Sequence, residues 1–133
     1  MGLLTSLVFG SPATFPRTAP TPPKIAAIDL YATASVLEAE ARGEPHKCQC
    51  LAMSVLVNRS RAKNTTIQRT SFRGFARKKP SERSVKIAKN FLTSHVQNAD
   101  FQYFLNPETA TDFDWVEATK KDWKVRCGAH VFW

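Results

Sequence analysis

The sequence predicts one mainly α-helical domain with a minor β element near its C-terminus. Three observations predict this fold class. The stretches 25–41 and 49–59 hold alanine and other apolar residues at helical spacing. Apolar residues in 81–96 also repeat about once per helical turn, whereas the final stretch, VRCGAHVFW, is rich in β-type residues. A chain of 133 residues is long enough for one modest core.

The chain divides into an N-terminal extension, residues 1–23, and a body, residues 24–133. Within the extension, the stretch SPATFPRTAPTPP (11–23) contains five prolines. Proline fixes φ and removes a backbone donor, so we expect an extended linker there. The apolar residues before it are expected either to dock on another surface or to fray. No apolar run approaches the roughly 18 residues that a membrane span needs.

The first predicted helix of the body, 25–41, ends before Gly43 and Pro45, which both favour a helix stop. The second, QCLAMSVLVNR (49–59), is apolar on most faces, and we therefore expect it to be buried. The following stretch, 64–80, is polar and basic, which predicts a connection with one short helical turn.

Ser81 can cap the third helix, along which Val85, Ala88, Leu92 and Val96 repeat at helical spacing. From residue 100 onward the signals change. The segment FQYFLNP is aromatic and ends in a turn pair, and the C-terminal stretch is typical of a short strand.

Positive charge is concentrated in the stretch Arg59–Lys89. The chain has a net charge of +8, and this stretch holds eleven Lys or Arg residues, with Glu82 as its one acid. Such a density favours binding to a polyanion, which includes nucleic acid, anionic wall polymers and acidic lipid. The alternative is a solvated face that keeps the protein soluble.

Three cysteines are present, Cys48, Cys50 and Cys127. Their spacing relative to the histidines lacks a zinc pattern, so we expect no metal site and no cofactor. We interpret the cysteines as small buried apolar residues. A bridge to Cys127 stays open as an alternative for a protein that works outside a reducing cytosol.

The segment LEAEARGEP (37–45) contains three glutamates in different settings. Glu40 falls in the last turn of the first predicted helix. Glu38 lies about 200° around the helix axis from Glu40, so we expect it to face water. Glu44 lies beyond the helix. Because the negative end of the helix dipole and burial both favour a neutral carboxyl group, Glu40 suits a general acid for a glycosidic oxygen.

A plainer interpretation is that Glu40 forms an ion pair with Arg42 or Arg59. The wider pattern of motifs favours the catalytic one. EARGEP (40–45) is followed by Q-x-x-A-x-x-V-L-x-N-R (49–59), Y-F-x-N-P-x-x-A (103–110), Trp115 and a terminal G-x-H-V-F-[aromatic]. In this order the motifs resemble the SleB-type cell wall hydrolases, which include spore-cortex-lytic enzymes and phage wall lysins. The resemblance covers roughly residues 25–133.

The resemblance implies a small lysozyme-like, lytic-transglycosylase-like domain in which Glu40 is the catalytic acid. It departs from the family pattern at Cys48, which stands where the family usually has glycine, and at SFRGFAR (71–77), which replaces a longer middle block. Aromatic candidates to stack on sugar rings are Tyr103 and Phe104. The candidates to hydrogen-bond the substrate are Glu44, Gln49, Asn106 and His130.

The resemblance implies cleavage of the glycosidic bond between MurNAc and GlcNAc in peptidoglycan, at the bacterial wall or from a phage particle. We expect a lytic transglycosylase with one catalytic glutamate, and a muramidase-type glycosidase is the alternative. The basic stretch would then hold the enzyme on anionic wall polymers, and the extension 1–23 would dock on a virion or another assembly. Two alternatives stay open. One is a nucleic-acid-binding protein that uses residues 59–89, and the other is a structural virion protein with an inactive hydrolase-like domain.

Overall fold

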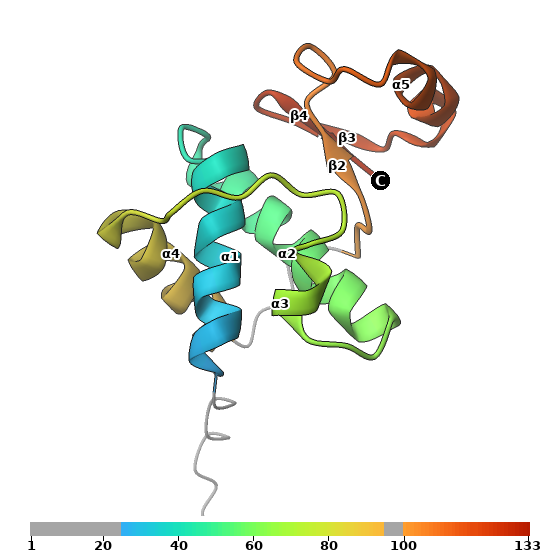
Figure 1. Cartoon of the computed structure of the whole chain (residues 1–133). Helices are drawn as coiled ribbons and strands as arrows, with labels where there is room; N and C mark the ends of the chain where they lie inside the picture. Colours follow the sequence, from blue (N-terminus) through green and yellow to red (C-terminus); the bar gives the residue numbers. More distant parts are fainter. Residues whose placement is uncertain (1–24, 95–99) are drawn as a thin grey trace, which may run out of the picture.

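The computed structural model describes residues 25–94 and 100–133. The extension 1–23 and Val96 therefore lie outside the described residues. A group of helices forms one part of the domain, and a small sheet with a further helix forms the other (Figure 1). The elements, in chain order, are α1 (Ala27–Glu40), α2 (His46–Ala62), α3 (Ile67–Thr70), α4 (Glu82–Thr93), β2 (Phe104–Leu105), α5 (Phe113–Thr119), the 3₁₀ helix η2 (Lys120–Asp122), β3 (Val125–Cys127) and β4 (His130–Phe132).

The core lies where α1 and α2 meet the sheet. Leu37, Met53 and Val55 are at most 2% exposed, and each such side chain contributes roughly 1.5–3 kcal/mol on burial. The rings of Phe104 and Phe132 join the same cluster from β2 and β4. This packing confirms the first two predicted helices and the burial of the second. Within the described residues, no helix combines the length and the apolar composition needed to cross a membrane.

The sheet has the strand order β2-β4-β3, and all its pairs are antiparallel. Phe104 pairs with Phe132, and Cys127 pairs with His130 across a tight hairpin turn. Gly128 opens that turn at a φ of 60°, a left-handed conformation that favours glycine in a two-residue hairpin. The small sheet near the C-terminus confirms the predicted fold class.

The helices α3 and α4 match the prediction, whereas α5 was not predicted. α3 is the short turn expected within 64–80, and the Ser81 hydroxyl caps α4 by accepting from the Ser84 amide. For α5, only a change of signal was expected after residue 100. Its start is marked by Asp112, whose side chain accepts from the Trp115 amide as an N-cap.

Residues 72–80, which we call the strap, connect α3 to α4 and cross over α1 (Figure 1). The Lys78 amide donates to the Ser35 carbonyl in the middle of α1, over 3.0 Å. A loop without regular structure is thereby fixed on a helix by its backbone, which limits the positions of the side chains next to Lys78.

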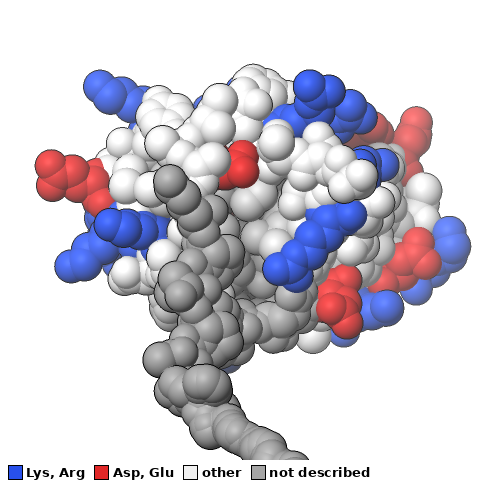
Figure 2. All heavy atoms as spheres, turned by 90° about the horizontal axis from the view of Figure 1, so that it is seen from below, with Lys and Arg blue, Asp and Glu red and all other residues white. Residues whose placement is uncertain are grey.

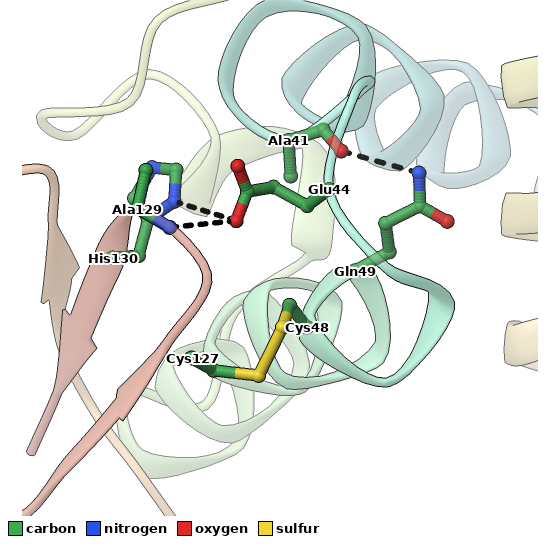
Figure 3. Close-up of a disulfide and its surroundings, with 7 residues drawn as sticks. All are labelled: Ala41, Glu44, Cys48, Gln49, Cys127, Ala129 and His130. Atoms are coloured by element: carbon green, nitrogen blue, oxygen red, sulfur yellow. Dashed lines mark hydrogen bonds and ion pairs between the residues drawn. A yellow bond between two sulfur atoms is a disulfide. The ribbon is translucent and has the colours of Figure 1, made fainter.

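Cys48 and Cys127 form a disulfide that joins the start of α2 to the end of β3 (Figure 3). Their Cα atoms are 5.4 Å apart, and 79 residues separate them in sequence. Our interpretation of these two cysteines as simple buried apolar residues is therefore wrong, although both side chains are buried. Spacing alone could not identify the pair, because contact depends on how the hairpin folds back onto α2.

Glu38 accepts three hydrogen bonds from the start of α4, from the Ser81 amide (2.9 Å), the Ser81 hydroxyl (2.7 Å) and the Ser84 hydroxyl (2.7 Å). Its side chain is only 7% exposed, so the expectation that it faces water is wrong. α4 packs on that face of α1. The three hydrogen bonds, led by the one from the Ser81 amide, lower the pKa of Glu38 to about 2, and Arg42 acts in the same direction.

Breaking the disulfide should destabilise the domain. For a loop of this length, the chain-entropy model gives a loss of about 4.5 kcal/mol in the free energy of unfolding. We expect Cys127→Ser, or reduction of the wild type, to show this loss in urea unfolding. Cys50→Ser is the matched control and should change stability little. Equal unfolding curves with and without reductant would contradict the prediction.

Replacing Glu38 should change how stability depends on pH. The carboxyl group titrates near 4.5 in the unfolded chain and near 2 in the folded one. As the pH falls, the unfolded chain therefore binds the proton first, and the stability contributed by ionised Glu38 is complete above pH 4.5 and lost on the way to pH 2. We expect Glu38→Gln to lower the melting temperature at pH 7 and to flatten its decline below pH 4.5.

Thermal unfolding at pH 7, 4 and 2 measures this effect. Glu82→Gln is the control, because Glu82 is exposed in the first turn of α4. Parallel melting curves for Glu38→Gln and the wild type across this range would show that the hydrogen bonds to Ser81 and Ser84 do not depend on the charge.

Candidate active site

Glu40 is the last residue of α1, as the sequence predicts. The chain then turns sharply, and the Glu44 amide donates back to the Ala41 carbonyl over 3.1 Å. Gln49, one turn into α2, fastens this turn by donating from Nε2 to the carbonyls of Ala41 (3.1 Å) and Arg42 (3.0 Å). The end of α1 and the start of α2 are thus held together, which fixes the positions of Glu40 and Glu44.

The strap reaches the Glu40 carboxylate with a backbone donor. The Ala76 amide donates to Oε2 of Glu40 over 3.0 Å, in an exposed part of the site. The alternative that Glu40 pairs with Arg42 is not supported, because Arg42 lies 3.3 Å from Glu38 instead.

Glu44 points from the turn after α1 into the β3–β4 hairpin (Figure 3). Its Oε1 accepts from the Ala129 amide over 2.9 Å and lies 3.9 Å from Nδ1 of His130. A Cβ atom added to Gly128 would lie 1.8 Å from the same oxygen. The glycine therefore serves two purposes, since it permits the left-handed turn and leaves room for the Glu44 carboxylate.

His130 is buried beside Glu44 and is 5% exposed. Its ring meets the edge of the Phe104 ring at 5.3 Å between centroids. Burial lowers the pKa of His130, while the negative charges of Glu44 and, to a smaller degree, Glu40 act in the opposite direction. Oε1 of Glu44 lies 3.9 Å from the imidazole, and the charge of Glu40 also acts on it. The structure therefore brings together three of the predicted residues, Glu40, Glu44 and His130.

A row of aromatic rings lies beside the second core cluster, formed by Leu105, Val116 and Val131. Tyr103 stacks on Trp133 with centroids 5.4 Å apart, and Trp115 lies 5.6 Å from Trp133. Tyr103 and Trp115 are 42% and 40% exposed. Partly exposed rings of this kind offer flat faces to a sugar. Trp133 was not predicted as a site residue, although the terminal motif includes it.

Arg59 contacts the row through the Tyr103 ring. Its guanidinium carbon is 5.0 Å from the centroid of the Phe75 ring and 5.2 Å from that of Tyr103. Burial lowers the pKa of this guanidinium. Arg59 thus links the strap to the aromatic row through cation–π contacts. It does not extend into solvent with the other cations of the 59–89 stretch.

Three other predicted residues have mainly structural contacts. Gln49 is 2% exposed, and its amide nitrogen is used by the turn described above. The Asn106 side chain accepts from the Glu108 amide over 3.0 Å and so shapes the turn after β2. Phe104 is 9% exposed and belongs to the core. We therefore assign these three residues to the support of the site.

Two further acids, Asp112 and Asp114, lie at the start of α5. Asp112 caps α5, and Asp114 lies exposed in the first turn of that helix. Among residues 25–94 and 100–133, no group of three or more His, Cys, Asp or Glu side chains is arranged to hold a metal ion.

On the face drawn in Figure 2, the basic side chains do not form a uniform positive surface. Lys and Arg side chains stand at several places there, and Asp and Glu side chains lie among them. Arg77, Lys78 and Lys79 are exposed on the strap, while Arg83, Lys86 and Lys89 are exposed on α4. These two sets carry the same charge on different elements.

Comparison with protein-family models and with curated proteins gives no match. Among solved structures, the chain is similar to the catalytic domain of the germination-specific lytic transglycosylase SleB from Bacillus anthracis. The TM-score is 0.64 at 23% identity, over 84% of this chain and 98% of that one. It is also similar to the catalytic domain of the Bacillus cereus SleB protein, with a TM-score of 0.60 at 25% identity over 84% of this chain and 94% of that one.

The architecture is thus that of a small, mainly helical catalytic domain with a minor C-terminal sheet. In particular, the chain has the fold of the SleB catalytic domain. This result confirms, at the level of the fold, the resemblance that the motifs predict.

The His130 cluster makes a prediction that NMR titration can check. Because the Glu44 charge raises the pKa of His130, we expect Glu44→Gln to lower that pKa further. Glu40→Gln should lower it by a smaller amount, since Glu40 has the weaker influence. Glu117→Gln on α5 is the control and should leave the His130 curve unchanged. A larger effect from Glu40→Gln than from Glu44→Gln would contradict the geometry.

Proposed function

We propose that this protein is a lytic transglycosylase that cleaves the glycosidic bond between N-acetylmuramic acid and N-acetylglucosamine in peptidoglycan. The observation that carries the proposal is Glu40. It ends α1 in a domain with the SleB catalytic fold, its Oε2 is held by the Ala76 amide, and its charge acts on His130. The likeness to lytic transglycosylase catalytic domains supports a peptidoglycan-cleaving enzyme.

In the first step Glu40 acts as the general acid. The proton on Oε1 passes to the glycosidic oxygen as the bond from that oxygen to C1 of the muramic acid breaks. The Ala76 amide holds the other carboxyl oxygen, so the carboxyl group keeps one orientation toward the bond. The N-acetylglucosamine leaves with the transferred proton as its new hydroxyl group.

In the second step the same carboxylate acts as the base. It takes the proton from the C6 hydroxyl of the muramic acid, and O6 forms a bond to C1, which closes a 1,6-anhydro ring. The nucleophile belongs to the reacting sugar itself, so proximity replaces both an activated water and a second catalytic carboxylate. Glu40 ends the cycle protonated and ready for the next one.

A one-carboxylate mechanism agrees with the roles of the neighbouring groups. A hydrolase that inverts or retains normally uses two carboxyl groups on either side of the bond. Here Glu44 accepts from the Ala129 amide and lies 18% exposed against the hairpin, so we assign it to the positioning of His130. The rings of Tyr103, Trp133 and Trp115 are the faces on which sugars of the glycan strand would stack.

Such an enzyme would act at the bacterial cell wall, outside the cytoplasmic membrane. The exposed cations of the strap and of α4 would help to hold it on anionic wall polymers, an attraction that salt screens. Packaging in a phage particle and docking through the extension 1–23 stay predictions.

Glu40→Gln tests the proposal directly. The amide keeps the shape of the side chain but cannot supply the proton, so we expect lysis of purified walls to fall by roughly 10²- to 10⁴-fold. Turbidity loss measures the rate, and thermal unfolding checks that the fold is kept. Glu117→Gln, which removes a surface charge paired with Lys120, is the matched control and should lyse walls normally. Glu38→Gln is no control, because Glu38 supports the fold.

Mass spectrometry of the digest identifies the chemistry. Products that end in 1,6-anhydromuramic acid are expected. Reducing ends would instead show hydrolysis and would contradict the intramolecular nucleophile. Normal lysis by Glu40→Gln would exclude Glu40 as the catalytic residue.

A further inference from the structure

A pocket of about 370 Å³ lies between α1, the end of α3 and the strap. It is separate from the cluster of Glu40, Glu44 and His130, since none of these residues lines it. Its volume lies near the lower limit of pockets that bind small molecules, which suits a ligand the size of a short peptide.

Three large apolar side chains line one part of this pocket. Ile28 and Tyr31 from α1 and Phe72 from the strap line it, and each is 56–57% exposed. Single exposed apolar side chains are ordinary, but three large ones around one concavity are a feature of a binding surface.

The other side of the pocket is cationic. Arg77, Lys78 and Lys79 line it, and no carboxylate does. The Arg77 guanidinium carbon lies 4.0 Å from the centroid of the Phe72 ring. This cation–π contact places the cation beside the apolar part of the lining. The nearby Asp29 carboxylate is used elsewhere, since its Oδ1 accepts from the Gln68 amide over 2.9 Å.

We propose that this pocket binds the carboxylate-bearing stem peptide of peptidoglycan. The proposal rests on the proposed function and deepens it, because it adds a peptide site to the glycan site. A stem peptide combines small aliphatic side chains with free carboxylates. The lining matches this chemistry, because it combines three large apolar side chains with three cations. A wall phosphate polymer is polar along its whole length and makes no use of Ile28, Tyr31 and Phe72.

The distances suit a peptide attached to the sugar that is cleaved. Ser35, which lines the pocket, lies five residues before Glu40, which corresponds to about 7.5 Å along α1. An extended peptide of about four residues reaches roughly 13 Å. Ser35 and Glu40 lie about 140° apart around α1, so a stem peptide on the muramic acid at Glu40 would follow the strap, which contacts both residues, and would reach the Ser35 end of the pocket.

The backbone of the strap forms hydrogen bonds at both sites. The Ala76 amide bonds Glu40, while the adjacent Arg77 and Lys78 line the pocket, and the Lys78 amide is fixed on Ser35. A peptide held by Arg77 and Lys78 thus fixes the same backbone that orients the catalytic carboxyl group. Substrates with a stem peptide should consequently bind better than bare glycan.

The test uses the full chain with Glu40→Gln, which prevents turnover, and isothermal titration with two soluble ligands. One ligand is a GlcNAc–MurNAc disaccharide with its stem peptide, and the other is the same disaccharide after an amidase has removed the peptide. We expect the first to bind about tenfold more tightly, which corresponds to about 1.4 kcal/mol. R77Q/K78Q/K79Q should remove this difference, and Phe72→Ala should reduce it.

The matched control is R83Q/K86Q/K89Q, which removes the same charge from exposed positions of α4. It should keep the preference for the stem peptide. Equal losses in both triple variants would overturn the proposal in favour of a diffuse electrostatic tether. Competition by a wall phosphate polymer that exceeds that of the free stem peptide would also overturn it.

Failure here can be distinguished from failure of the proposed function. Wall lysis by the wild type and its loss in Glu40→Gln report on the function alone. If lysis depends on Glu40 but the two ligands bind equally well, the enzyme assignment stands and the peptide pocket is refuted.

Discussion

The attachment of the β3–β4 hairpin to the turn between α1 and α2 is the constraint on which the rest of the site depends. The strands of this sheet have only two or three residues each, and such a sheet is not stable alone in water. Besides the packing of Phe104 and Phe132 in the core, two contacts fasten it, the Cys48–Cys127 disulfide and the hydrogen bond from the Ala129 amide to Glu44. The departure from the family pattern at Cys48 thus has a structural meaning, because this residue supplies the covalent contact.

The strap applies a second constraint through its backbone. Its amides reach Ser35 and Glu40, so its path is fixed without requiring particular side chains at Ala76 or Lys78. The side chains of Phe72 and Arg77 are consequently available for a second purpose. A short connection can therefore orient a carboxyl group with its backbone and line a separate pocket with its side chains.

The sequence predicted the helical fold and the small sheet because these depend on local signals, and short motifs named Glu40, Glu44 and His130 as candidates. That these three come together depends on contacts such as the one between Glu44 and Ala129, 85 residues apart. The wrong or missing parts depend on contacts between distant segments. The spacing of Glu38 from Glu40 indicates a residue that faces solvent. However, the start of α4 covers Glu38, and Ser81, which donates to it, is 43 residues away in sequence. The disulfide spans 79 residues, and no spacing rule indicates it. Only α5 had an overlooked local signal, the cap at Asp112.

The three glutamates of LEAEARGEP show how position in the fold, more than residue type, determines what a carboxylate does. Glu38 is enclosed by three hydrogen bonds that keep it ionised, and an ionised carboxylate bound in this way cannot deliver a proton at neutral pH. Glu44 accepts from the hairpin and is committed to holding His130. Glu40 has one fixed oxygen and an exposed amide partner in the strap, so the other oxygen stays available to a substrate. Of the three, Glu40 alone combines a fixed orientation with access, and a general acid needs both.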